Sequence, residues 1–449
     1  MLGRTIAALA SDLTAGKTTS RALVETALAA IARDGSAFTR VAAERARSDA
    51  DASDRQRAQG VVASTLAGIP ISVKDLFDVA GETTSAGSAV LREAPPAVRD
   101  APAIARLRKA GAVIVGRTHM SEFAFTGLGV NPHFPVCANP SDASRVPGGS
   151  SSGAAASVAR GQAAMGLGTD TGGSVRIPAA FCGLVGFKPT QRRITREGAF
   201  PLSESLDSIG PIANSVACCR ASDAILSDAP VGEHAPLRLV GMRFAVPTDF
   251  VLDGVDSIVG LAFERALSAL SAAGALVERV RFPEFARIPE ITARGTIANA
   301  ESFAFHTRMG MLKQRERYDP NVLARIEIGA RMTASDYIDL LHARAALIRD
   351  TDARSGGCDG LLMPAVACVA PRFADVAEPT AFARANGLAL RNASLINFLD
   401  RCALSVPMSR AGEMPSGLMI VGETMGDARL LAVCEAVEAA LQLALSSRS

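Results

Sequence analysis

The stretch LGTDTGGSVRIP, residues 167–178, places Ser174 directly behind two glycines and an alternation of threonines. Glycines in this position let the backbone turn tightly and be approached closely. Ser174 is therefore a candidate nucleophile. A serine nucleophile needs a neighbouring base to take its proton, so the rest of the chain has to supply one.

Histidine is the usual base in such sites, and the sequence has five histidines. They are His119, His133, His234, His306 and His342. None lies in an HxxxH pattern, and the G-x-S-x-G turn is missing around Ser174. A histidine remote in the sequence can still reach the serine through the fold, so a Ser/His/Asp triad stays open.

Two other stretches compete to supply the chemistry. VPGGSSSGAAAS, residues 146–157, holds three consecutive serines behind two glycines. ISVKDLFDVAG, residues 71–81, places Lys74 at the end of a predicted strand, where α/β sheets commonly build their sites. Taken alone, the first pattern is typical of a turn, and a Lys-Asp pair is typical of a solvated strand end. A nucleotide-binding nest is disfavoured, because GGSSSGAA lacks the lysine of a P-loop.

Strand and helix patterns alternate along the chain. Short β-rich runs bounded by glycine and proline predict strands in AGIPISVKD, AGAVIVGR, GLLMPAV, ALSVPM and SGLMIVG. Helical patterns cover residues 20–34, with Thr19 or Ser20 as N-cap, residues 103–110 and residues 427–445. This alternation predicts the α/β class with a large sheet and helical layers. We expect one domain over residues 1–449, with a catalytic core at about 60–230 and a helix-rich excursion at about 285–350.

Composition excludes several classes of protein. The 449 residues carry a formal net charge of only +2, so the chain lacks the excess of basic residues that is typical of nucleic-acid-binding proteins. No apolar run approaches the roughly 20 residues that span a bilayer, and the N-terminus lacks the pattern of a signal peptide. The 8 cysteines form no CxxC and no zinc-site spacing, which favours reduced thiols. We therefore expect a cytoplasmic protein that binds neither nucleic acid nor a membrane.

Together, the three motifs resemble the amidase signature family. The resemblance rests on a lysine that ends a strand, then Gly-Gly-Ser-Ser-Ser, then Thr-Gly-Gly-Ser placed 24 positions after Ser150. It includes NPSDASRVPGGSSSGAAASVA, GLGTDTGGSVRIPAAFCGLVGFKPT and PLSESLDSIGPIA, and weaker similarity extends to SGLMIVG near the C-terminus. The fold that it implies is a large mixed β-sheet covered by helices on both faces.

The resemblance also implies an activity and a set of catalytic residues. Family members hydrolyse carboxamides with a Ser–cis-Ser–Lys triad, in which Ser174 matches the nucleophile, Ser150 the bridging serine with a cis peptide, and Lys74 the base. Thr171, Gly172 and Gly173, together with the N–H of Ser174, match the oxyanion hole. The resemblance implies no metal and no organic cofactor.

A lysine base has to be uncharged to take a proton. At the ordinary pKa of about 10.4, only roughly one free lysine in 2,500 is neutral at pH 7. Burial of Lys74 beside uncharged serines would lower its pKa. Asp75 follows directly, but in a strand it points to the opposite face, so it need not hold the proton on Lys74.

The residues on either side of Ser174 give information about the charge of the substrate. Asp170 and Arg176 are expected to pair and support the loop, in preference to a role for Arg176 in binding a carboxylate. A malonamidase-like member of the family uses an arginine one position later, where this chain has Ile177. Within HMSEFAFTGLGVNPHF, residues 119–134, the apolar side chains expected to line an acyl pocket are Phe123, Phe125, Leu128 and Phe134. We therefore expect a small-molecule substrate, namely a neutral aliphatic or aryl amide.

One alternative within the family is the A subunit of glutamyl-tRNA amidotransferase, which releases ammonia from glutamine for a partner subunit. SESLDSIGP and GFKPT suit either function, while residues 318–348 look more like those of stand-alone amidases. The family-level expectation for assembly is a homodimer.

Overall fold

The computed structural model describes residues 2–229 and 237–446. Within these residues, one mixed sheet of 11 strands runs through the molecule in the order β1-β3-β2-β4-β6-β5-β10-β11-β9-β7-β8. The strands are β1 (Phe38–Val41), β2 (Pro70–Lys74), β3 (Val113–Thr118), β4 (Met165–Asp170), β5 (Val185–Lys188), β6 (Ser208–Ala213), β7 (Arg243–Pro247), β8 (Leu276–Val280), β9 (Gly360–Pro364), β10 (Ala403–Pro407) and β11 (Gly417–Val421).

Helices occupy most of the remaining chain. The α-helices are α1 (Ile6–Thr14), α2 (Ser20–Arg33), α3 (Ala43–Ala58), α4 (Pro102–Lys109), α5 (Ser152–Ala159), α6 (Arg176–Phe181), α7 (Val216–Ser227), α8 (Ser257–Ala272), α9 (Ile288–Ile291), α10 (Ile297–Arg308), α11 (Pro320–Ile328), α12 (Ala334–Ser355), α13 (Pro379–Phe398) and α14 (Asp427–Ser446). Short 3₁₀ turns are η1 (Glu122–Ala124), η2 (Gln191–Arg193), η3 (Phe285–Arg287), η4 (Met311–Arg317), η5 (Gly329–Arg331) and η6 (Ala374–Val376).

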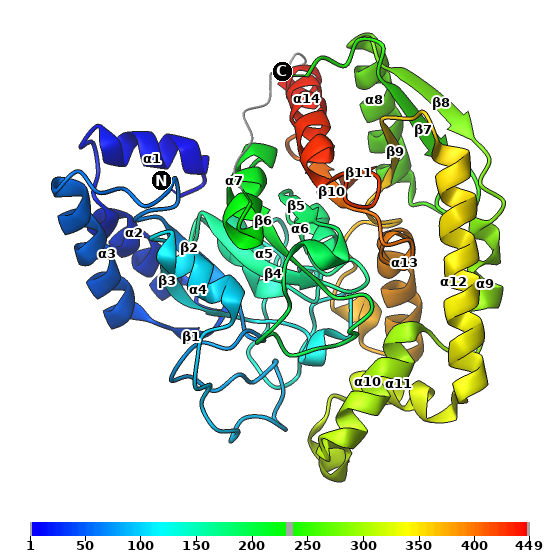
Figure 1. Ribbon diagram of the computed structural model, residues 1–449, viewed down its shortest axis with the longest axis horizontal. Coiled ribbons are helices and arrows are strands. Elements are labelled where there is room, and N and C mark those ends of the chain that lie inside the picture. Colours follow the sequence, from blue (N-terminus) through cyan, green and yellow to red (C-terminus); the bar gives the residue numbers. More distant parts are fainter. Residues whose placement is uncertain (1, 230–236, 447–449) are drawn as a thin grey trace.

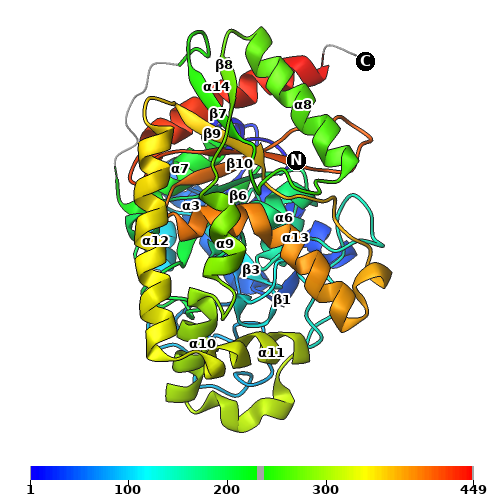
Figure 2. The same ribbon diagram turned by 90° about the vertical axis from the view of Figure 1, so that its right-hand side faces the viewer.

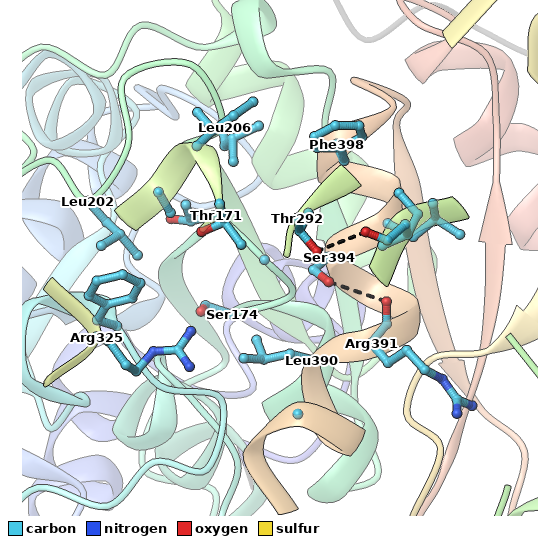
Figure 3. Close-up of a pocket in the computed structure, with 18 of the residues that line it drawn as sticks. Thr171, Ser174, Leu202, Leu206, Thr292, Arg325, Leu390, Arg391, Ser394 and Phe398 are labelled. Atoms are coloured by element: carbon cyan, nitrogen blue, oxygen red, sulfur yellow. Dashed lines mark hydrogen bonds between the residues drawn. The ribbon is translucent and has the colours of Figure 1, made fainter. Parts of the chain in front are cut away.

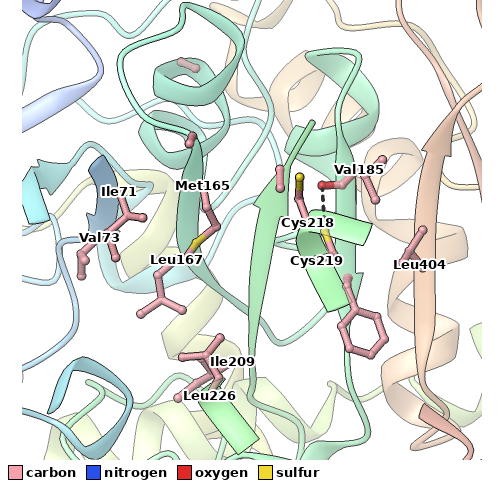
Figure 4. Packing of buried hydrophobic residues seen from close by; sticks show 14 of the residues in the cluster. Ile71, Val73, Met165, Leu167, Val185, Ile209, Cys218, Cys219, Leu226 and Leu404 are labelled. Atoms are coloured by element: carbon pink, nitrogen blue, oxygen red, sulfur yellow. Dashed lines mark hydrogen bonds between the residues drawn. The ribbon is translucent and has the colours of Figure 1, made fainter. Parts of the chain in front are cut away.

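Helices cover both faces of the sheet. On one face, α7 packs on β6 and β5, where Cys219 contacts the carbonyl oxygen of Val185 and Leu226 lies beside Ile209 (Figure 4). The opposite face of β4 carries glycines and receives α5, while α6 packs beside it on β5, β10 and β11. Figure 1 shows α1–α3 at one end of the sheet and α8 and α12 at the other. The predicted α/β class, with a large mixed sheet covered on both faces, is confirmed.

The predicted elements also fall where the sequence patterns place them. Thr19 is the N-cap of α2, and its side chain accepts a hydrogen bond from the N–H of Ala22. Lys74 is the last residue of β2. Between β8 and β9 the chain is helical, and α10 and α11 lie at the lower edge of the molecule in both views (Figures 1 and 2). The expected helix-rich excursion at about 285–350 corresponds to this segment.

Close approach of α5 to the sheet positions the serines that precede it. An added Cβ on Gly166 would lie 2.7 Å from the carbonyl oxygen of Ala154 in α5, and one on Gly168 would lie 2.7 Å from Oγ of Ser151. Glycine is needed at both positions because any side chain would push the N-terminal end of α5 away from β4. The absence of these side chains brings Ser150 and its neighbours against the end of the strand.

We expect Gly166→Ala to destabilise the protein by about 1–3 kcal/mol, because the new methyl group meets a helix backbone that cannot move cheaply. Urea denaturation monitored by circular dichroism measures the change. Gly260→Ala in α8 is the matched control, since no atom lies within 4 Å of the added methyl there. That variant should be more stable by about 0.5–1 kcal/mol. Equal stability of the two variants would contradict the close-approach argument.

Candidate active site

Three segments meet where β2 and β4 end. These strands are parallel neighbours, with Val73 opposite Leu167, so their carboxyl ends lie at the same edge of the sheet. Lys74 ends β2, Ser150 precedes α5, and the turn from Thr171 to Ser174 joins β4 to α6. The structure therefore brings together the three residues that the sequence motifs place far apart.

Lys74 is fully buried and its amine contacts hydroxyl groups. Nζ of Lys74 lies 2.7 Å from Oγ of Ser150 and 2.8 Å from Oγ1 of Thr169. The Gly149–Ser150 peptide bond is cis. Ser174 is 3% exposed, and its carbonyl oxygen accepts a hydrogen bond from the N–H of Ser151 at 3.2 Å. Within residues 2–229 and 237–446, no hydrogen bond joins the hydroxyls of Ser150 and Ser174 in this conformation.

The surroundings of Lys74 favour the uncharged amine. Burial lowers the pKa of Lys74 to about 7, and the negative charges of Asp207 and Asp170 oppose that shift. Asp75 does not contact Lys74 Nζ, because its carboxylate pairs with Arg117 at 3.0 Å on the other side of the strand. At a pKa of about 7, about half of the molecules carry a neutral Lys74 at neutral pH.

A buried ion pair holds the turn that carries Ser174. Asp170 and Arg176 are both 0% exposed, with Nη2 of Arg176 2.9 Å from Oδ1 of Asp170. Asn397 of α13 also donates to Asp170 at 2.9 Å. Burial alone would raise the pKa of Asp170, but the charge and hydrogen bonds of Arg176 hold it well below its ordinary value. Arg176 also donates to the carbonyl oxygen of Ala393 and to the side chains of Asn397 and Met419, so its polar contacts tie the turn to α13 and β11.

The N–H groups of the turn divide into two sets. The N–H of Gly173 donates to Asp170 at 2.8 Å, so it is not free to meet an oxyanion in this arrangement. This differs from the expectation that Gly173 is an oxyanion-hole donor. Among the residues that the structure describes, the N–H groups of Thr171, Gly172 and Ser174 have no hydrogen-bond acceptor. Gly173 is required for another reason: its φ is +122°, and an added Cβ would lie 2.5 Å from that of Ala393.

Thr171 is held by a second buried carboxylate. Its hydroxyl donates to Asp207, which also accepts from the N–H groups of Leu202 at 2.9 Å and Ser203 at 3.1 Å. Burial raises the pKa of Asp207 to about 6. The loop at residues 202–203 is thereby fixed against the turn that precedes Ser174.

A cavity of about 370 Å³ opens beside Ser174. Its wall is largely apolar and comes from the turn that carries Ser174, from α13 and from the helical segment between β8 and β9. Residues in this wall include Phe125, Thr126, Thr171, Gly172, Leu202, Leu206, Ile297, Arg325, Leu390, Ser394 and Phe398, several of which are labelled in Figure 3.

Of the residues expected to line an acyl pocket, the structure places only Phe125 in the cavity wall. Phe123 is 1% exposed and packs against His306 with ring centroids 4.6 Å apart. Leu128 is fully buried in a core cluster. Phe134 lies on another face and lines a small cavity with Arg117. The expectation was wrong for these three because an apolar pattern in a loop does not distinguish core packing from the wall of a cavity.

Arg325 is a cavity residue that the sequence patterns did not single out. It comes from α11, lies with its guanidinium 4.8 Å from the centre of the Phe125 ring, and points into the cavity on the side of Ser174 (Figure 3). Its Nε is buried without a hydrogen-bond partner, and within the described chain Arg325 forms no ion pair. Burial lowers its pKa to about 10, so it stays charged at neutral pH. Arg391, also in the wall, instead donates to backbone carbonyls at Val251 and Asp253.

The histidines have other partners. His119 contacts Ser152 at 2.8 Å, His133 contacts Glu122 at 2.9 Å, and His306 contacts Tyr318 at 2.9 Å. His342 is exposed on α12. His234 lies outside the described residues. In the described ranges, therefore, no histidine is hydrogen-bonded to Ser150 or Ser174.

The described residues include neither a cluster of metal-binding side chains nor a helix that could span a membrane. Over residues 2–229 and 237–446, no group of three or more His, Cys, Asp or Glu side chains could hold a metal ion. None of the helices in those ranges has both the length and the apolar character required to cross a membrane.

Comparison with known proteins agrees with this geometry. The family model described as Amidase matches residues 22–431. The chain is 38% identical over 406 residues to 2-amino-5-chloromuconic acid deaminase of Comamonas testosteroni, covering 88% of this chain and 86% of that protein. It is 36% identical over 459 residues to the A subunit of glutamyl-tRNA(Gln) amidotransferase from Anaeromyxobacter sp. (strain K), covering 93% and 92%. A crystal structure of an amidase matches with a TM-score of 0.88 and 34% identity, over 97% of this chain and 99% of that one. The chain therefore belongs to the amidase signature family and is an amide-hydrolysing enzyme.

Proposed function

We propose that the enzyme hydrolyses its amide through an acyl-enzyme on Ser174, with Ser150 and Lys74 as a proton relay. The observation that carries the proposal is the fully buried Lys74 amine, 2.7 Å from Ser150, beside the turn that presents Ser174 to a cavity. Neutral Lys74 takes the proton of Ser150 while Ser150 takes that of Ser174, and Oγ of Ser174 bonds to the amide carbon. Binding of the amide would draw the two serine hydroxyls into contact.

The second half of the cycle reverses these proton transfers. The relay returns the proton to the leaving nitrogen, the C–N bond breaks, and ammonia or an amine departs from an ester on Ser174. Water then attacks the ester, losing its proton to the same relay, and the carboxylate product leaves. The free N–H groups of Thr171, Gly172 and Ser174 supply the donors for both tetrahedral oxyanions. The hydrogen bond from the Gly173 N–H to Asp170 holds the turn that carries these groups.

The cavity supports a substrate with a carboxylate. Arg325 is half-buried in an otherwise largely apolar wall, forms no ion pair with the described residues, and has a buried Nε without a hydrogen-bond partner. An anionic group in the cavity would give this guanidinium a charged partner. A substrate carboxylate would pair with it while the amide reaches Ser174. The chloromuconic acid deaminase among the relatives is also named for a substrate that is an acid. This revises the expectation of a neutral amide, which rested on the apolar side chains near residues 119–134 and on Ile177.

A second candidate function is glutamine hydrolysis as the A subunit of a tRNA-dependent amidotransferase. The 36% identity to such a subunit over 93% of the chain favours it, and glutamine carries a carboxylate that would suit Arg325. Purification from native cells discriminates the two functions. A second subunit that co-purifies and is needed for glutamine turnover would favour the amidotransferase.

A homodimer and a cytoplasmic location stay predictions. All 8 cysteines are free, as expected of a protein from a reducing compartment. Size-exclusion chromatography with light scattering would measure the oligomeric state, and fractionation of native cells would give the location.

Removal of either end of the relay should abolish turnover. We expect Ser174→Ala to lose labelling by a fluorophosphonate and to lower kcat/KM by at least about 10⁴-fold. Lys74→Ala should lower kcat/KM by about 10³-fold or more, because Ser174 then has no base. Thermal unfolding of both variants checks that the fold is kept. Full activity in Lys74→Ala would return the search to a histidine base.

The pH profile should report the amine of Lys74. Because burial lowers its pKa to about 7, the neutral base is present above that pH and is lost below it. We expect kcat/KM to rise tenfold per pH unit on an acid limb that levels off near pH 7. In Asp207→Asn the limb should move to lower pH, since the Asp207 carboxylate raises the pKa of Lys74. An acid limb unchanged in that variant would rule out Lys74 as the group titrating.

Arg325→Ala should discriminate between charged and neutral substrates. Succinamate and butyramide differ mainly in one carboxylate, and ammonia release measures the hydrolysis of either. We expect KM for succinamate to rise about 10–100-fold, as for loss of a charge-assisted hydrogen bond, with a much smaller change for butyramide. If wild-type enzyme turned over butyramide best and Arg325→Ala affected both amides equally, the carboxylate subsite would be refuted.

A further inference from the structure

Glu122 is a buried carboxylate that the proposed catalytic cycle does not use. It is 0% exposed and lies in η1, three residues before the Phe125 that lines the cavity. Its carboxylate accepts from Oγ of Ser88 at 2.6 Å and lies 2.9 Å from Nε2 of His133. Burial raises the pKa of Glu122 to about 7. A fully buried carboxylate that contacts Ser88 and His133 is costly to keep in the protein, so we expect it to stabilise a further contact.

The remaining contact of Glu122 reaches the helix that carries Arg325. Oε2 of Glu122 accepts from the backbone N–H of Asp319 at 2.7 Å. Asp319 is the N-cap of α11, and its own side chain caps the N–H of Asn321. Arg325 follows six residues later on the same helix, about 9 Å along its axis at 1.5 Å per residue. A shift at the first residue of α11 therefore moves the guanidinium in the cavity.

Neighbours of Glu122 attach the same helical segment to the core. Phe123 packs edge-on against His306 of α10, at 4.6 Å, and lies 5.3 Å from the ring of Tyr318, which precedes Asp319. Phe125 lies under the guanidinium of Arg325 at 4.8 Å. Residues 122–125 thus contact α11 at both its beginning and its functional side chain, and Glu122 makes the polar contact among them.

We propose that Glu122 is a positioning residue for substrate selection: by holding the N–H of Asp319 it fixes α11, and so places the Arg325 guanidinium where a substrate carboxylate meets it. This rests on the proposed function, since it concerns the carboxylate subsite of that reaction. Glu122 touches neither the substrate nor the reacting atoms.

The test compares succinamate with butyramide as probes. In Glu122→Ala we expect KM for succinamate to rise at least tenfold, while kcat/KM for butyramide and fluorophosphonate labelling of Ser174 change less than threefold. Glu122→Gln should restore most of the loss, because its amide oxygen still accepts from the N–H of Asp319. Glu122→Asp keeps the charge but is one carbon shorter, so it should behave like the alanine variant.

Glu438 offers a matched control. It is also a carboxylate whose pKa burial raises to about 7, and it accepts from a backbone N–H at the first residue of a helix, Val216 of α7, at 3.2 Å. Its helix, α14, packs on α7, α8, β10 and β11, and lies at the opposite end of the molecule from α11 (Figure 1). Glu438→Ala should lower the midpoint of thermal unfolding and leave the succinamate-to-butyramide ratio of kcat/KM at the wild-type value.

The outcomes separate the two levels of the proposal. The positioning role would be overturned if Glu122→Ala lost activity equally on both amides. It would also be overturned if Glu438→Ala changed the succinamate-to-butyramide ratio of kcat/KM as much as Glu122→Ala does, or if Glu122→Asp left that ratio unchanged. If Arg325→Ala loses succinamate selectivity and Glu122→Ala keeps it, the carboxylate subsite stands and this inference alone falls. Release of ammonia from neither amide by the wild-type enzyme would overturn the proposed substrate class and this inference with it.

Discussion

A lysine amine removed from water and placed among hydroxyl groups is the constraint on which the rest of the site depends. Lys74 is fully buried, and its nearest partners are Ser150 and Thr169, neither of which carries a charge. Desolvation disfavours the ammonium form, so the environment favours the uncharged amine that the proposed proton relay requires. The glycine face of β4 serves this arrangement, because it lets the start of α5 bring Ser150 close enough to contact the amine.

Charge around the site is segregated. Three carboxylates lie near Lys74 in the sequence or in space, and each is engaged elsewhere: Asp75 by Arg117, Asp170 by Arg176, and Asp207 by Thr171 and two backbone N–H groups. Burial of such pairs is costly, and full hydrogen bonding offsets that cost. Because Asp170 also binds the N–H of Gly173, the same pair that satisfies a buried charge shapes the turn that presents Ser174.

In the proposed mechanism, substrate recognition and the chemistry come from different parts of the chain. Lys74, Ser150 and Ser174 lie on the sheet and its adjoining turns, whereas Arg325 comes from the helical segment inserted between β8 and β9. A segment that packs on the core through a few polar and aromatic contacts can change its lining residues without disturbing the relay.

The sequence by itself determined the strand–helix alternation, the end of β2 at Lys74 and the serine motifs, because local periodicity and glycine spacing are properties of short stretches. It also pointed to the paired roles of Asp170 and Arg176, six residues apart. Only the tertiary structure decided which N–H groups of the turn are free, which phenylalanine reaches the cavity, and that Arg325 enters it. The choice of phenylalanine and the entry of Arg325 depend on contacts between residues more than 100 positions apart, such as Phe123 with His306 and Phe125 with Arg325, and no local pattern encodes such a contact. The state of the N–H groups depends on the exact path of the turn, because the carboxylate of Asp170 meets the N–H of Gly173 only in the folded conformation.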